Sequence, residues 1–145
     1  MKSVLDFINE NRIHIPKYLF HKSSFSIRNK ILNEGLKATI GASTDIHSGD
    51  KNLQPGIFLF DANKQVYDST YDDDIWVIDT SKLDKTKFIK DYDEFMYKTF
   101  GSVVYTEDIS KTNIELIYKG SKKDSNEKSL KTELECIKKI LKLIL

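Results

Sequence analysis

The sequence predicts one small domain of the α+β class, and two features lead to this prediction. Short apolar runs of high strand propensity recur along the chain, and brief helical patterns separate the early runs whereas polar loops separate the later ones. These segments amount to roughly five to seven strands and two or three helices, which favours α+β over a doubly wound parallel sheet. With 145 residues, the chain is long enough for a single core.

Composition narrows the classes of function. The formal net charge is +1, so there is no global electrostatic case for nucleic-acid binding, although local patches remain open. The only cysteine, Cys136, excludes an internal disulfide framework and a cysteine-based metal cluster, which fits a reducing, cytoplasmic environment. No apolar run has the length of a signal peptide or a membrane span, so we expect no membrane partner.

The segment over 18–36 predicts a strand, a turn, a helix and a second turn. The strand begins with Tyr18–Phe20, which are aromatic or aliphatic residues of high strand propensity. Ser23 and Ser24 are good N-cap residues for the helix that follows. Gly35 is expected to end this helix as a left-handed C-cap.

The same segment places groups that can bind an anion at one strand end. His21 and the two serine hydroxyls face the start of a helix, whose free N–H groups and positive dipole end suit a phosphate. Arg28 adds a guanidinium that can bind a phosphate through two hydrogen bonds. Taken alone, these residues favour the simpler interpretation of a structural histidine followed by an ordinary helix cap.

The remaining elements follow from apolar runs and their polar boundaries. The segment over 83–101 is charged and aromatic, and helix and short strand both stay open for it. The other expected elements are a helix over 3–11, strands over 36–40, 56–60, 75–78, 102–106 and 114–119, a polar loop over 41–55 and a short helix over 62–71.

The C-terminal part predicts a charged linker over 121–128 and an amphipathic helix from Ser129. Its apolar residues step by four, three, four and three, so they form a narrow seam that either docks onto the domain or pairs with a second copy in a homodimer. The predicted organisation is therefore an N-terminal helical segment over 1–17, a domain over 18–120, and a linker with an amphipathic helix over 121–145. The seam consists of Leu130, Leu134, Ile137, Leu141 and Ile144.

The order of these segments resembles the ADP-ribosyltransferase fold, the split β-sheet fold of poly-ADP-ribose polymerases, many bacterial toxins and RNA 2′-phosphotransferases. His21-Lys22-Ser23 is similar to the family's His-x-Thr/Ser unit, and the stretch over 31–36 reads Ile-Leu-x-x-Gly-Leu. The run over 56–60 corresponds to the strand that bears a nicotinamide-stacking aromatic, and 102–120 is similar to the final pair of strands. The resemblance covers 18–120 and implies a split sheet with short helices.

This resemblance implies an NAD⁺ site and an ADP-ribosyltransferase or NAD-cleaving activity on a protein or nucleic acid. His21 would contact a ribose hydroxyl, Ser23 would support the nicotinamide end, and Arg28 would face the pyrophosphate. The aromatic residue that would stack on the nicotinamide ring is Phe58, Phe60 or Tyr67.

The main departure from the family is the catalytic carboxylate. In many members a glutamate opens the strand that here begins near Gly101 or Ser102, and neither residue is acidic. Glu107, at the far end of that strand, is the candidate catalytic carboxylate, and His21 is the other candidate catalytic residue. A second glutamate, Glu94, precedes the strand. The RNA 2′-phosphotransferases use His and Arg instead, but their full set is not found. A non-catalytic module that binds a nucleotide or a partner on the same fold is the alternative.

No metal site is expected. His14, His21 and His47 are too dispersed for a recognisable zinc motif. The acidic run Asp72–Asp74 lacks the alternating ligand spacing and the glycine of a calcium-binding loop, so it predicts a charged entry into a strand.

Overall fold

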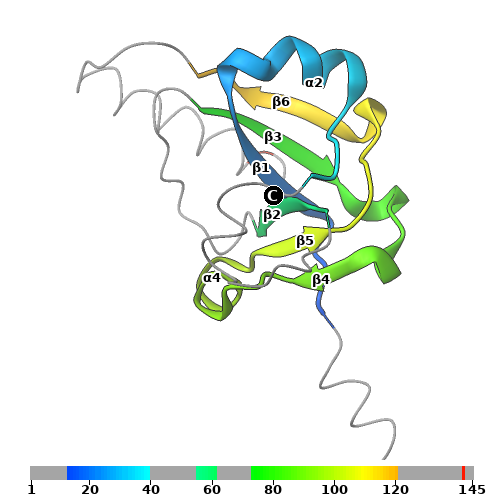
Figure 1. The fold of residues 1–145 in the computed structure, drawn as a ribbon, viewed down its shortest axis with the longest axis vertical. Coiled ribbons are helices and arrows are strands. Elements are labelled where there is room, and N and C mark those ends of the chain that lie inside the picture. Colours follow the sequence, from blue (N-terminus) through cyan, green and yellow to red (C-terminus); the bar gives the residue numbers. More distant parts are fainter. Residues whose placement is uncertain (1–12, 40–54, 62–72, 121–141, 143–145) are drawn as a thin grey trace, which may run out of the picture.

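The computed structural model describes residues 13–39, 55–61, 73–120 and 142. Within these residues, six strands form one antiparallel sheet in the order β4-β5-β2-β1-β3-β6, accompanied by two short α-helices (Figure 1). The α+β class is therefore confirmed. The strands are β1 (Tyr18–Ser24), β2 (Ile57–Asp61), β3 (Asp73–Asp79), β4 (Phe88–Lys90), β5 (Val103–Tyr105) and β6 (Ile114–Tyr118); the helices are α2 (Arg28–Glu34) and α4 (Glu94–Phe100); the 3-10 turns are η1 (Phe25–Ile27), η2 (Thr80–Lys82), η3 (Lys85–Lys87) and η4 (Lys111–Asn113).

The sheet consists of two three-stranded halves that are joined over a very short distance. β1 pairs with β3 along its whole length, from Tyr18 opposite Asp79 to Ser24 opposite Asp73. Between β1 and β2 the described residues form only two pairs, Leu19↔Asp61 and Phe20↔Phe60. After Phe20↔Phe60 the two central strands separate. Figure 1 shows β1, β3 and β6 on one side of the β1–β2 boundary and β2, β5 and β4 on the other.

Apolar residues fill both faces of the sheet because successive side chains of a strand point to opposite faces. Leu19 belongs to the larger cluster, which α2 covers through Ile31, whereas its neighbour Phe20 belongs to the smaller cluster on the other face. The larger cluster also contains Leu36, Ile57, Leu59, Trp76, Ile78, Phe88, Val103, Tyr105 and Ile109, and the smaller one contains Ile75, Val77, Ile117 and Tyr118.

Most strand predictions are confirmed within one or two residues, and one is wrong. The apolar runs over 56–60, 75–78, 102–106 and 114–119 form β2, β3, β5 and β6. The segment over 36–40 forms no strand in its described part, because Leu36 bridges Ile109 whereas Thr39 bridges Gly56, so its two ends pair with different elements.

The segment over 83–101, for which the sequence left helix and short strand open, contains both. It contains the short strand β4 and then α4, whose first turn is capped by the side chain of Asp93, which accepts a hydrogen bond from the backbone N–H of Phe95. The predicted helices over 3–11 and 62–71, the loop over 41–54 and, apart from Lys142, the C-terminal helix with its dimer seam lie outside the described residues. None of the helices that the structure describes is long and apolar enough to cross a membrane.

The entry and exit of α2 differ in detail from the prediction. Ser24 caps η1 by accepting a hydrogen bond from the Ser26 N–H, whereas Ser23 remains inside β1. Gly35 ends α2 as expected, but its φ of 77° and ψ of −168° lie outside the left-handed helical region. This extended ψ leads the chain directly into the backbone pairing of Leu36 with Ile109.

We expect Gly35→Ala to lower the free energy of unfolding by about 2–4 kcal/mol, measured by urea denaturation. The backbone conformation disfavours any side chain, and an added Cβ would overlap the carbonyl oxygen of Ile109 and come within 2.8 Å of the Lys111 nitrogen. The control is Asn33→Ala, at an exposed position of the same helix, which we expect to stay within about 0.5 kcal/mol of the unchanged protein. Equal stability of the two variants would contradict this account of the α2 exit.

Candidate functional site

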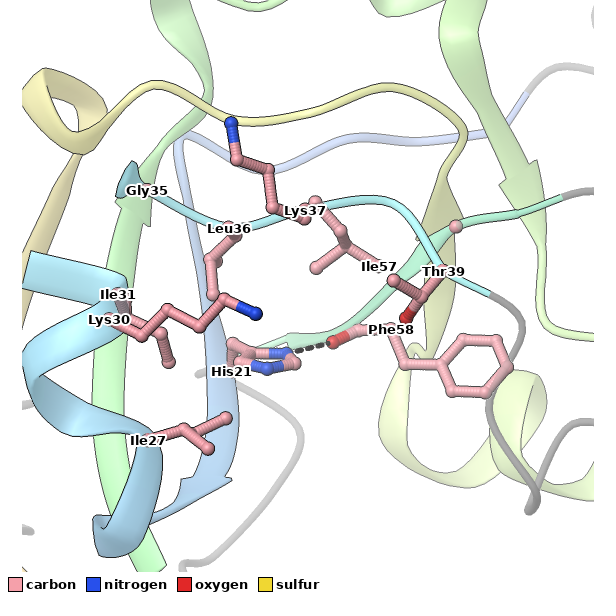
Figure 2. Close-up of a pocket in the computed structure, with 11 residues that line it drawn as sticks. His21, Ile27, Lys30, Ile31, Gly35, Leu36, Lys37, Thr39, Ile57 and Phe58 are labelled. Atoms are coloured by element: carbon pink, nitrogen blue, oxygen red, sulfur yellow. Dashed lines mark hydrogen bonds between the residues drawn. The ribbon is translucent and has the colours of Figure 1, made fainter. Parts of the chain in front are cut away.

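A pocket of about 300 Å³ opens where β1 and β2 separate (Figure 2). Its walls come from β1, from α2 and the turn before it, from the segment after α2, and from the start of β2. The lining residues are His21, Ile27, Lys30, Ile31, Gly35, Leu36, Lys37, Thr39, Gly56, Ile57 and Phe58.

Local structure explains why these residues meet. Ile31 anchors α2 in the core, and Ile27, Lys30 and Ile31 share one face of the helical segment because they step by three and one residues. After the turn at Gly35, the chain crosses toward β2 and is held there by two backbone hydrogen bonds between Thr39 and Gly56, of 3.3 and 3.1 Å. The pocket is therefore bounded by α2 and the segment after it, which follow β1, and by the start of β2.

His21 connects the two separated strands through its side chain. Its Nδ1 lies 2.8 Å from the carbonyl oxygen of Phe58, so a hydrogen bond spans the gap where backbone pairing between β1 and β2 has ended (Figure 2). A carbonyl oxygen only accepts hydrogen bonds, so we assign the proton to Nδ1. In the neutral ring Nε2 is then an acceptor, and it has no hydrogen-bond partner among the described residues.

Burial favours this neutral form. Desolvation lowers the pKa of His21, and the hydrogen bond to the Phe58 carbonyl opposes the shift only in part. The imidazole is therefore uncharged at neutral pH and presents a lone pair. Such a group can accept a hydrogen bond from a ligand hydroxyl or take its proton.

The charges of the pocket are all positive. Two lysines and no carboxylate occur among its lining residues. Figure 2 shows the Lys30 ammonium directed toward the side of the pocket that holds His21, whereas the Lys37 ammonium points away. Lys37 Nζ lies 3.6 Å from Asp108 Oδ2. Apolar walls with a cation and one neutral acceptor suit an organic anion.

The pocket brings together two of the residues predicted from the sequence, His21 and Phe58. Ser23 is buried within the sheet, where its Oγ accepts a hydrogen bond from Trp76 Nε1 at 2.8 Å. Phe60 packs against Phe20 with ring centroids 5.9 Å apart, on the face of the smaller cluster. Neither Ser23 nor Phe60 lines the pocket.

Arg28 holds structural elements together. Its Nε and one terminal nitrogen donate to the two carboxylate oxygens of Asp74 at 2.8 and 2.7 Å, and the same terminal nitrogen donates to the Gly120 carbonyl at 2.9 Å. Asp74 is fully buried and also accepts from the Gly120 N–H at 2.7 Å. These contacts raise the pKa of Arg28 and tie the start of α2 to β3 and to the chain after β6.

The candidate catalytic carboxylate lies outside the lining of the pocket. Glu107 is exposed and forms an ion pair with Lys87 at 3.4 Å, outside the lining of the pocket. At the start of β5, Ser102 is fully buried and its hydroxyl donates to Asp91 Oδ2 at 2.5 Å. Tyr67 lies outside the described residues.

Metal binding finds no support in the described part of the chain. No group of three or more His, Cys, Asp or Glu side chains there could hold a metal ion. Of the acidic run Asp72–Asp74, Asp73 and Asp74 are the first residues of β3, and Asp74 is bound to Arg28, which fits the predicted charged strand entry.

The sequence interpretation missed four residues of the pocket, namely Lys30, Leu36, Lys37 and Thr39. For Lys30 a signal existed, because it lies three residues after Ile27 and therefore on the same side of the helical segment. For Leu36 and Thr39 no local signal exists, since they reach the pocket only through pairing with distant residues.

Comparisons of the chain with protein-family models, with curated proteins and with solved structures gave no match. Inference about function therefore starts from the six-stranded sheet and the pocket beside it.

We expect the free energy of unfolding to fall as the pH drops below about 6.5, the ordinary pKa of a histidine. With the pKa of His21 lowered in the folded state, the unfolded chain binds the additional proton first, so this contribution to stability is lost toward acidic pH. His21→Asn keeps a donor near Nδ1 but cannot titrate in this range. Urea denaturation at pH 7 and pH 5.5 should show a smaller loss for this variant, and equal losses would contradict the assignment.

We expect Arg28→Met to lower the free energy of unfolding by about 2–4 kcal/mol, because it leaves the buried Asp74 carboxylate without its cation. Arg28→Met combined with Asp74→Asn should recover part of this loss, since asparagine is uncharged and its oxygen can still accept from the Gly120 N–H. Urea denaturation measures both variants. A double variant no more stable than the single one would argue against the structural role of the pair.

Proposed function

We propose that this chain is an NAD⁺-dependent ADP-ribosyltransferase or NAD⁺-cleaving enzyme that acts on a protein or a nucleic acid. The observation that carries the proposal is the position of His21, which lies where β1 and β2 separate and lines a pocket with positive charge. The pocket volume of about 300 Å³ is at the lower end of the range usual for small-molecule sites.

The fold supports the proposal because the sequence resemblance is to a split β-sheet. Among the described residues β1 and β2 form two pairs and none after Phe20↔Phe60, which is compatible with the opening that this resemblance implies. The histidine of the His-x-Ser unit is at the first position after the last β1–β2 pair, Phe20↔Phe60. The residues that carry the resemblance and the opening in the sheet thus coincide.

The chemistry of the lining residues fits the nicotinamide riboside part of NAD⁺. His21 Nε2 would accept a hydrogen bond from a ribose hydroxyl, because the Nδ1 proton is engaged by Phe58. Phe58 remains the residue proposed to stack on nicotinamide, whose positive charge in NAD⁺ is favourable against an aromatic face. Its ring points away from His21 in this structure, so stacking would require the ring to turn toward the pocket.

The proposed reaction breaks the bond between ribose C1′ and the nicotinamide nitrogen. Nicotinamide leaves with the bonding electrons as a neutral molecule, and positive charge develops on the ribose. A nucleophile of the acceptor then bonds to C1′ and loses its proton; with water as the acceptor the net reaction is NAD⁺ cleavage. A carboxylate would stabilise the developing charge, and Glu107 remains the proposed residue, although in this structure it pairs with Lys87.

A non-catalytic module that binds a nucleotide or a partner protein is the second candidate. The observation that favours it is the composition of the pocket, because no carboxylate occurs among the lining residues. The strand at which many members of the resembled family carry a glutamate begins here near Gly101 or Ser102, neither is acidic, and the Ser102 hydroxyl is bonded to Asp91. As a nucleotide-binding module it would use the same pocket as the first candidate and would lack turnover.

The test is nicotinamide release from NAD⁺, followed by proton NMR, with His21→Ala and His14→Ala as a matched pair of variants. His14 is exposed and lies outside the pocket, so its variant controls for the loss of a histidine. We expect release by the unchanged protein and by His14→Ala, and a loss of at least about tenfold in His21→Ala, as is common when a positioned acid–base group is removed.

Other outcomes separate the two candidates. Binding of NAD⁺ without release, with or without an added acceptor protein or nucleic acid, would support the non-catalytic module. Glu107→Gln that releases nicotinamide at the unchanged rate would remove Glu107 from the mechanism. Absence of both release and NAD⁺-dependent chemical shift changes would overturn the proposal.

A further inference from the structure

We infer that Lys30 binds a phosphate of the ligand and thereby sets its orientation, with the phosphate at Lys30 next to the ribose at His21. This inference rests on the proposed function, because it concerns NAD⁺ in the same pocket. It assigns the phosphate to a residue that differs from the Arg28 expected from the sequence.

Lys30 is a cation without a protein counterion in the described part of the chain. α2 carries it on the pocket side, and Figure 2 shows its ammonium extending into the space beside His21. Among the described residues Lys30 has no ion-pair or hydrogen-bond partner, so a ligand phosphate would not have to displace one. An ammonium in such a position binds a phosphate as a point charge with three donors.

The other nearby cations are engaged. The hydrogen bonds of Arg28 go to the fully buried Asp74 and to the Gly120 carbonyl, and Arg28 does not line the pocket. Lys37 lines the pocket, but its ammonium points away and lies 3.6 Å from an Asp108 oxygen. The imidazole of His21 is neutral because burial lowers its pKa. Lys30 therefore supplies the accessible positive charge among the described lining residues.

The position of Lys30 next to His21 sets the direction of the ligand. In Figure 2 the Lys30 ammonium lies beside the imidazole of His21, whereas the Phe58 ring points away from both. In NAD⁺ a phosphate is bonded to the ribose that carries nicotinamide, so a ribose at His21 would bring this phosphate within reach of Lys30. The reverse direction would bring the positively charged nicotinamide ring toward the ammonium of Lys30, and like charges repel.

The experiment measures the binding of three probes by calorimetry: NAD⁺, ADP-ribose, which has the phosphates without nicotinamide, and nicotinamide riboside, which has no phosphate. The variants are Lys30→Gln, Lys37→Gln, Phe58→Leu and, as a control for the loss of an exposed lysine outside the pocket, Lys119→Gln. Glutamine and lysine have similar helix propensities, so Lys30→Gln should leave α2 intact.

We expect Lys30→Gln to weaken NAD⁺ and ADP-ribose by about five- to tenfold, the size of one partly exposed charged contact, and to leave nicotinamide riboside unchanged. Lys37→Gln should weaken the phosphate-bearing probes less, and Lys119→Gln should have no effect. Phe58→Leu should weaken NAD⁺ and nicotinamide riboside more than ADP-ribose.

Two results would overturn the inference in distinguishable ways. If all three probes bind and Lys30→Gln changes none of them, or changes nicotinamide riboside as much as NAD⁺, the phosphate is not at Lys30 although the proposed function stands. If none of the probes binds the unchanged protein, the proposed function fails and the inference fails with it.

Discussion

The hydrogen bond between His21 Nδ1 and the Phe58 carbonyl is the contact on which the pocket depends. Backbone groups at the edge of a strand need partners, and in a continuous sheet the neighbouring strand supplies them. Here β1 and β2 part after two residue pairs, so the β2 carbonyl that faces the gap is satisfied by a side chain. An imidazole reaches further than a backbone N–H, and it therefore keeps the strands connected while leaving space beside them for a ligand.

A second set of interactions holds the helical wall of the pocket in place. Arg28, at the start of α2, is bound to the fully buried Asp74 of β3, and both contact the backbone of Gly120. A buried carboxylate is tolerated because it is paired and fully hydrogen-bonded. The Gly35 turn fixes the other end of α2 against Ile109. Lys30, between these two fixed ends, is thus presented by a well-anchored helix although its own side chain is exposed.

These features explain why binding and turnover have to be considered separately for this chain. The residues that line the pocket can satisfy a hydroxyl, through His21, and a phosphate, through Lys30. They include no carboxylate that could stabilise positive charge on a ribose, and Glu107 is held by Lys87 at the surface. An enzyme would need a rearrangement or an acceptor that completes the site, whereas a binding module would need neither.

The sequence by itself determined the local elements of this protein. Apolar runs between polar boundaries located β1, β2, β3, β5 and β6, and the residue types at Ser24 and Gly35 marked the two ends of the first helical segment. These predictions succeeded because strand propensity, capping and glycine turns act between residues that are close in the chain. His21 and Phe58 were identified as site residues through the resemblance to a family, which already contains information about how distant segments meet.

Only the tertiary structure decided which side chains remain available to a ligand. The sequence cannot show that Asp74, 46 residues away, takes the hydrogen bonds of Arg28, or that Trp76 takes the hydroxyl of Ser23. Nor can it show that a segment of expected strand character divides its pairing between Ile109 and Gly56. The physical reason is the same in each case: hydrogen bonds and ion pairs of buried groups are satisfied by partners that the pairing of strands brings together, and that pairing is not encoded locally.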